Sequence, residues 1–202
     1  MDEEIPMLEK IIHKFNISKL LIDSYQVTQN YLRRLSDSVK TMYIDDLNMF
    51  EYPVDIIVCY ANYWKRFCYN GNRLQPKLLL GTKYVPLREA FWNCTEKEIQ
   101  ADVETLLLLS GGTDPYNFLD KILQKIELRQ FTRVDVVCGR YNLNYEILCQ
   151  KYKKYLNVVV YKNVSDMKKY MQDADLAVSA GGTTLYELCA VGTPTISYSF
   201  AD

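Results

Sequence analysis

The sequence predicts an α/β fold in which parallel sheets are covered by helices. From Thr105 onward, short apolar runs alternate strictly with helical segments, giving five strands and four helices. Runs such as Leu106–Leu109 are continuously apolar, which is typical of parallel strands buried on both faces. Four more apolar runs lie in the first half, with fewer regular helices between them. We therefore predict two Rossmann-like lobes with parallel sheets, the second nearly complete and the first, N-terminal lobe incomplete.

The first lobe is expected over residues 1–94. Its helices are predicted from amphipathic spacing, and its strands from apolar runs bounded by turn-rich stretches. In order, the predicted elements are a helix from about Glu4 to Phe15, a strand at Leu20–Ile22, a helix from about Val27 to Asp37, and strands at Thr41–Ile44, Asp55–Cys59 and Lys77–Leu80.

The second lobe is expected over residues 103–202, after a charged linker near Trp92–Asp102. Each of its strands is an apolar run followed by turn residues and then a helical pattern. In order, the predicted elements are strand Leu106–Leu109, helix Pro115–Leu128, strand Val134–Cys138, helix Tyr145–Lys154, strand Val158–Tyr161, helix Asp166–Gln172, strand Leu176–Val178, helix Leu185–Val191 and strand Thr195–Tyr198.

Both lobes carry signs of truncation. The chain stops at Phe200–Asp202, directly after a predicted buried strand, where a doubly wound lobe would continue with a covering helix. The first lobe has no strand–glycine loop–helix opening. We therefore expect this chain to be a fragment of a longer protein.

Composition excludes several classes of function. Lys and Arg total 24 against 25 Asp and Glu, so the net charge of −1 argues against a nucleic-acid-binding surface, and Lys65, Arg66 and Arg73 are too few for an anionic lipid surface. No apolar run is long enough for a signal peptide or stable membrane insertion, so we expect a cytoplasmic protein. His13 is the single histidine, and the six cysteines never occur at two-residue spacing, so no metal site is predicted.

Two glycine-containing loops each follow a predicted strand and open a predicted helix. The first is Ser110–Pro115, in which Gly111, Gly112 and Thr113 precede Asp114 as the expected N-cap. The second holds Ser179, Gly181, Gly182, Thr183 and Thr184 and leads to Glu187. Each loop suits an anion at a helix N-terminus. Each also has an explanation without a ligand: a tight turn for the first loop, and a Thr184–Glu187 capping box for the second.

The position of the two loops favours a ligand site. In a doubly wound sheet of strand order 3-2-1-4-5-6, the first loop follows strand one and the second follows strand four, which are neighbours where the order reverses. Ligands of such sheets bind in that crevice. Because neither a dinucleotide fingerprint nor a Walker lysine loop occurs, we predict a phosphate-bearing ligand of another kind and no cofactor.

The second loop resembles the nucleotide-sugar signature of GT-B proteins related to the peptidoglycan N-acetylglucosaminyltransferase. The residues that carry this resemblance are Ser179–Glu187 and Gly192-Thr193-Pro194. Together with Ile22-Asp23-Ser24-Tyr25 and the Gly111–Asp114 loop, they also resemble UDP-2,4-diacetamido-2,4,6-trideoxy-β-L-altropyranose hydrolase of the pseudaminic acid pathway, a family often described beside spore-coat polysaccharide proteins. The resemblance extends over nearly the whole chain.

The resemblance implies a GT-B-like fold and a UDP-sugar as ligand. It implies that Glu187 holds the ribose hydroxyls, that residues 181–184 face the diphosphate, and that the segment around Asn163 and Val164 meets uracil. It also implies that Tyr25 lines the sugar site, where we expect it to act in catalysis. An exposed turn tyrosine is the alternative for Tyr25.

The chain departs from this family pattern at the catalytic histidine. The family carries that histidine in an N-terminal Gly-x-Gly-His loop, whereas His13 lies at a helix end, where it suits the helix dipole. The general base is therefore expected outside this chain. Three hypotheses stay open: a fragment of a UDP-sugar hydrolase, a GT-B UDP-sugar glycosyltransferase, and a non-catalytic nucleotide-sugar-binding module. The identity of the sugar and the oligomeric state are not predicted.

Overall fold

The computed structural model describes residues 1–69 and 75–199, so Arg73 and the chain end at Phe200–Asp202 lie outside the described residues. The chain divides into two compact units, Met1–Pro86 (unit 1) and Leu87–Asp202 (unit 2). The segment expected to link the lobes, near Trp92–Asp102, therefore groups with unit 2. Its anchor is Phe91, which is 2% exposed and packs against Leu107 and Leu188 in that unit.

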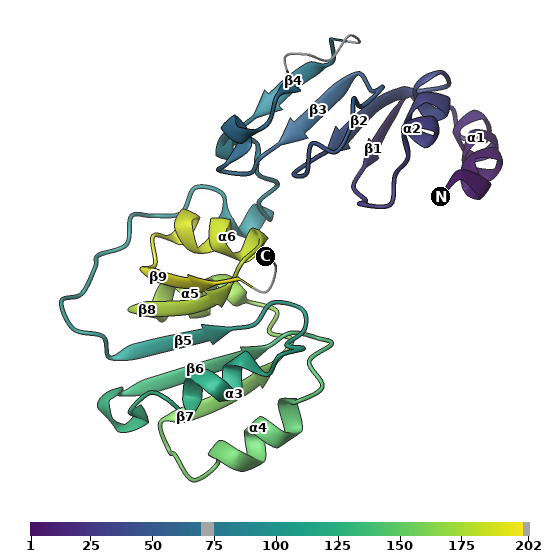
Figure 1. Ribbon diagram of the computed structural model, residues 1–202. Helices are drawn as coiled ribbons and strands as arrows, with labels where there is room; N and C mark the ends of the chain where they lie inside the picture. The colour runs from purple at the N-terminus through teal and green to yellow at the C-terminus, as the bar shows by residue number, and fades with distance from the viewer. Residues whose placement is uncertain (70–74, 200–202) are drawn as a thin grey trace. The chain divides into compact units, whose positions relative to one another are not determined.

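Unit 1 is a four-stranded parallel sheet with helices (Figure 1). Its strands follow one another in the order β1-β2-β3-β4, and the helix between the first two strands packs on one face of the sheet. The core lies on that face, where Leu32 and Leu35 pack with Ile57. The elements are η1 (Asp2–Glu4), α1 (Ile5–Lys14), β1 (Lys19–Ile22), α2 (Gln29–Ser36), β2 (Lys40–Ile44), β3 (Ile56–Cys59), η2 (Trp64–Arg66), β4 (Lys77–Leu80) and η4 (Thr82–Tyr84).

Unit 2 is a five-stranded parallel sheet of order β7-β6-β5-β8-β9. The predicted reversal of strand order, with the first strand of the unit beside the fourth, is thereby confirmed. The elements are η5 (Glu89–Phe91), β5 (Thr105–Leu109), α3 (Phe118–Leu123), η6 (Leu128–Gln130), β6 (Arg133–Cys138), α4 (Tyr145–Tyr152), β7 (Val158–Lys162), α5 (Met167–Asp173), β8 (Leu176–Ala180), α6 (Thr183–Val191) and β9 (Thr195–Tyr198).

Helices cover both faces of the unit 2 sheet (Figure 1). Leu106 and Leu108 of β5 belong to the core formed with α3 and α4, whereas Leu107 and Leu109 belong to the core formed with η5, α5 and α6. The central strand therefore needs apolar residues at every position, which explains the uninterrupted leucine run. All the predicted strands and helices are present, and the α/β fold with two Rossmann-like parallel sheets is confirmed.

Three helix starts differ from the prediction by two residues or more: α2 begins at Gln29, α3 at Phe118 and α6 at Thr183, and α3 also ends at Leu123, before the predicted Leu128. The third helix begins at Phe118, not at Pro115, because Asn117 adopts a left-handed conformation (φ 54°) and interrupts the helical backbone. The side chain of Asp114 still caps this helix, since its carboxylate accepts hydrogen bonds from the N–H groups of Phe118 and Leu119 at 2.8 and 3.1 Å. The sixth helix starts at Thr183, two residues earlier than predicted, with Gly182 as its N-cap residue.

Candidate functional site

The two predicted glycine loops lie at the same edge of the unit 2 sheet. They follow β5 and β8, which are paired in parallel from Leu106↔Leu176 to Leu109↔Ser179. A cavity of about 200 Å³ lies at this edge, and we call it the switch-point cavity. It is lined by Arg88, Leu109, Gly111, Gly112, Val137, Cys138, Gly139, Asn163, Val164, Met167, Thr184 and Glu187.

Five of the predicted site residues line this cavity, namely Gly111, Gly112, Val164, Thr184 and Glu187. They come from the first glycine loop, the segment after β7 and helix α6. Segments up to 76 residues apart in the sequence are thus brought together by the strand order. In the described part of the chain, the other predicted binding residues flank the cavity without lining it: Thr113, Asp114, Ser179, Gly181, Gly182 and Thr183.

Three of these flanking residues have structural partners of their own. Asp114 is 4% exposed and caps α3, and Ser179 is fully buried, with its hydroxyl donating to the carbonyl of Ala180 at 3.1 Å. The N–H of Gly181 donates to the carbonyl of Tyr198 at 2.9 Å. The prediction that these polar groups face a ligand is therefore not supported by their side-chain and backbone contacts. Thr113 and Thr183 are exposed.

The second loop ends in a helix start suited to an anion. Gly182 has φ 122°, a backbone conformation that favours glycine, and it turns the chain into the nine-residue helix α6. The N–H groups at a helix start have no acceptor within the helix, and they carry the positive end of the helix dipole. Thr184, in this first turn, lines the cavity. This end of the cavity therefore favours negative charge.

Glu187 does not close a capping box. Its carboxylate forms a bidentate ion pair with Arg88, with Nε to Oε1 at 2.6 Å and Nη2 to Oε2 at 2.9 Å. The Glu187 side chain is 10% exposed and the Arg88 side chain 55%. The first turn of α6 has no side-chain cap. The alternative in which Glu187 bonds back to the N–H of Thr184 is therefore wrong, and the carboxylate is held at the cavity wall.

The opposite wall comes from the carboxyl ends of β6 and β7. Asn163, with φ 52°, donates its N–H to the carbonyl of Cys138 at 2.9 Å and so turns the chain towards Val164 and Met167. Burial raises the pKa of the Cys138 thiol to about 12, so it stays protonated at neutral pH. This wall is thus uncharged and offers backbone groups and apolar side chains.

Gly139 is a site residue that sequence reasoning missed. It follows β6 and touches the first glycine loop so closely that a Cβ atom there would lie 2.0 Å from the carbonyl oxygen of Gly111. The N–H of Tyr141 donates to the carbonyl of Gly112 at 3.1 Å and joins the two loops again. The sequence shows only that Gly139 is a glycine directly after a predicted strand. Its contact with Gly111 and Gly112 joins segments far apart in the sequence, so the sequence does not reveal it.

Tyr25 lies in unit 1, just beyond β1, and its side chain is exposed. Its hydroxyl donates to Oδ2 of Asp46, which follows β2, at 2.9 Å. This hydrogen bond, which is the largest cause, and partial desolvation of the hydroxyl, which is the second, raise the pKa of Tyr25 to about 12. His13 lies in the last turn of α1, as predicted. At neutral pH the tyrosine is therefore a protonated hydroxyl held by a carboxylate.

The side chains that the structure describes are those of residues 1–69 and 75–199. Within these ranges no three His, Cys, Asp or Glu side chains gather in a way that could hold a metal ion. Nor does any helix in them have the length and apolar character needed to cross a bilayer.

The fold and the cavity define an α/β protein of the GT-B-like Rossmann type, with a ligand cavity where the strand order of unit 2 reverses. Comparison with known proteins agrees with this class, since residues 106–199 match the model of the glycosyltransferase family 28 C-terminal domain. The match spans β5 to β9, and therefore both glycine loops.

The chain is also similar in sequence to known proteins of three organisms. The chain is 29% identical over 125 residues to an uncharacterized protein of Methanocaldococcus jannaschii, covering 57% of this chain and 26% of that protein. It is 26% identical over 144 residues to a spore coat polysaccharide biosynthesis protein of Bacillus subtilis, covering 69% and 42%. It is 30% identical over 116 residues to the UDP-N-acetylglucosamine–N-acetylmuramyl-(pentapeptide) pyrophosphoryl-undecaprenol N-acetylglucosamine transferase of Campylobacter fetus, covering 55% and 33%.

The matched segment thus spans less than half the length of each of these relatives. The family match and the two functional names show that this segment is similar to glycosyltransferase-like and polysaccharide biosynthesis proteins. They do not confirm the narrower resemblance to the pseudaminic acid pathway hydrolase.

The contact at Gly139 predicts a stability difference between two glycines of the cavity. Gly139→Ala should lower the free energy of unfolding by about 1–3 kcal/mol, because the new methyl group overlaps Gly111 and Gly112. Gly112→Ala is the matched control, with nothing within 4 Å of its Cβ, and should change stability by less than about 0.5 kcal/mol. Urea denaturation measures both variants. Equal stabilities would show that the loops do not pack as described.

The Tyr25–Asp46 hydrogen bond predicts a pH dependence. Tyr25 should titrate at a pKa of about 12, and Asp46→Asn should bring it down towards the ordinary value of about 10, because the amide removes the acceptor charge that favours the protonated hydroxyl. Carbon-13 NMR of labelled tyrosine, assigned with Tyr25→Phe, follows the titration. Asp23→Asn is the control, since Asp23 contributes least among the neighbouring charges that raise the pKa of Tyr25. Titration of the wild type near pH 10 would contradict the hydrogen bond.

Proposed function

We propose that the chain binds a UDP-sugar, with the UDP portion in the switch-point cavity, and that it serves glycosyl transfer from this donor. The observation that carries the proposal is Glu187: a carboxylate held on α6 at the wall of a cavity bounded by a glycine loop and a helix start. A carboxylate accepts hydrogen bonds only, so it suits the vicinal hydroxyls of a ribose.

The remaining walls suit the other parts of UDP. The first turn of α6 and the Gly111–Gly112 loop offer backbone N–H groups to a diphosphate, which the helix dipole also favours. The uncharged wall at Asn163 and Val164 offers backbone groups and an apolar surface to a uracil ring. These N–H groups would stabilise the negative charge on UDP as it leaves the sugar. This is the step that the site would assist.

Glycosyl transfer is the preferred reaction because the family model and the Campylobacter fetus relative both carry glycosyltransferase names. In transfer, an acceptor hydroxyl attacks the anomeric carbon and UDP leaves. In hydrolysis, water takes the place of the acceptor, and this second candidate rests on the resemblance through Asp23, Tyr25 and the Gly111–Asp114 loop. In either case we propose that Tyr25 belongs to the sugar side and that the protein acts in the cytoplasm.

UDP binding tests the proposal directly. Glu187→Ala should weaken UDP binding by about 1.5–3 kcal/mol, or roughly 10- to 150-fold, because a hydrogen-bonded charged partner of the ribose is lost. Isothermal titration calorimetry measures the affinity, with melting curves recorded alongside. Glu146→Ala, on the exposed face of α4, is the control and should bind UDP like the wild type. Unchanged UDP affinity in Glu187→Ala, with lowered stability, would reject the ribose role.

Turnover by these 202 residues alone should lie below detection. Attack on an anomeric carbon gains about 10²–10⁴-fold from a positioned general base. The titratable residues that line the described cavity are Arg88, the protonated thiol Cys138 and Glu187, whose carboxylate is paired with Arg88. Incubation with a UDP-sugar, with free sugar and UDP measured by chromatography, checks this. Release of free sugar without an acceptor would support hydrolysis and reveal a base within these residues.

A further inference from the structure

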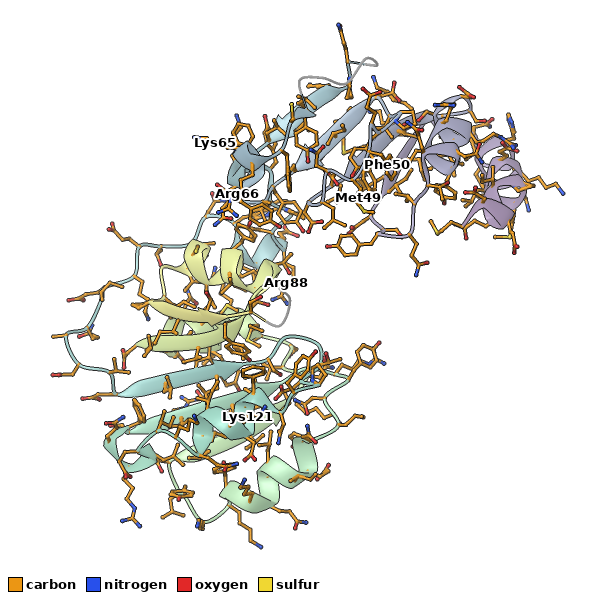
Figure 2. All side chains as sticks on the ribbon, in the orientation of Figure 1. Met49, Phe50, Lys65, Arg66, Arg88 and Lys121 are labelled. Carbon is orange, nitrogen blue, oxygen red and sulfur yellow. The ribbon has the colours of Figure 1, made fainter. Side chains whose placement is uncertain are left out.

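Arg88 lines the switch-point cavity but was not among the predicted site residues. It lies at the start of unit 2, directly before η5 and 99 residues from Glu187 in sequence. Figure 2 shows its labelled side chain beside helix α6. Both oxygens of Glu187 receive one hydrogen bond each from the guanidinium, at 2.6 and 2.9 Å. This two-bond pairing fixes both the position and the plane of the carboxylate.

The guanidinium of Arg88 is also held by the aromatic ring of Phe91. Its Cζ atom lies 5.0 Å from the centre of the Phe91 ring, within the range of a cation–π contact. Phe91 is 2% exposed and belongs to the core shared by β5 and α6, so this support is rigid. The Trp92 indole N–H donates to the carbonyl of Leu87 at 3.0 Å and fixes the segment on either side of Arg88. The ion pair with Glu187 raises the pKa of Arg88, so the guanidinium stays positively charged at neutral pH.

After pairing with Arg88, the Glu187 carboxylate can still accept further hydrogen bonds. An ionised carboxylate offers about four lone-pair sites, two on each oxygen. Arg88 uses one site on each oxygen, so one remains on each. Two remaining sites on neighbouring oxygens match the two vicinal hydroxyls of a ribose.

We propose that Arg88 is the positioning residue of this site: it fixes Glu187 so that the carboxylate receives the two ribose hydroxyls, and it acts on the ligand through Glu187. The proposal rests on UDP binding in the switch-point cavity. A free glutamate side chain would have to be ordered when the ligand binds, at a cost in side-chain entropy. Arginine suits this role better than lysine, because its planar fork holds both oxygens at once.

Arg88 has a competing role that the same cavity permits. The guanidinium carries five N–H donors, and two of them are used on Glu187. The other three could reach a phosphate oxygen of UDP. A phosphate contact and a positioning role differ in one respect: positioning matters only when the ligand has ribose hydroxyls.

A pair of ligands that differ only in those hydroxyls separates the roles. UDP and 2′,3′-dideoxy-UDP are titrated into the wild-type chain, Arg88→Met and Arg88→Lys, by calorimetry. Arg88→Met should weaken UDP by about tenfold and dideoxy-UDP by less than about twofold. Arg88→Lys, which keeps the charge but loses the fork, should fall between the wild type and Arg88→Met for UDP. It also serves as the test variant if Arg88→Met does not fold, with its loss again confined to UDP.

A second variant, Glu187→Gln, tests whether the effect of Arg88 on UDP affinity depends on the Glu187 carboxylate. In Glu187→Gln, adding Arg88→Met should cause no further loss of UDP affinity, because the carboxylate that Arg88 holds is gone. Equal losses for UDP and dideoxy-UDP would overturn the positioning role and assign Arg88 to the phosphates or to general stability. Failure of the wild-type chain to bind UDP would overturn the proposed function, and the role of Arg88 with it.

Discussion

The reversal of strand order between β5 and β8 is the constraint on which the candidate site depends. Because the sheet is extended in one direction through β6 and β7 and in the other through β8 and β9, the connections leave β5 and β8 towards opposite faces. The loops after these two strands then diverge and leave a cavity at the carboxyl edge of the sheet. The two glycine loops, the turn at Asn163 and the start of α6 all meet there.

Charge is distributed unevenly around that cavity. The start of α6 favours an anion, the wall at Cys138 and Val164 is uncharged, and the buried carboxylate of Glu187 is balanced by Arg88. A buried carboxylate without a cation would be costly, so the ion pair lets an acceptor group remain ionised at the cavity wall. The cavity can therefore present backbone donors at the start of α6 and a carboxylate acceptor at Glu187, both of which a nucleoside diphosphate requires.

The fold could be predicted from the sequence because its signals are local. Each strand of unit 2 is a continuous apolar run, and each is followed by turn residues and a helical pattern. The site was only partly predictable. The spacing of Thr184 and Glu187 fits a capping box equally well, and the sequence does not show that Arg88 reaches Glu187. The tight contact of Gly139 with Gly111 and the reach of Asp114 to Phe118 likewise depend on three-dimensional packing.

Backbone amide NMR during a UDP titration tests the central claim, that UDP occupies the switch-point cavity, most directly. The account predicts that the amide signals of Gly111, Gly112, Val164 and Thr184 shift together with one dissociation constant, while those of β1 to β4 stay in place. Shifts confined to unit 1, or spread without relation to these four residues, would contradict it.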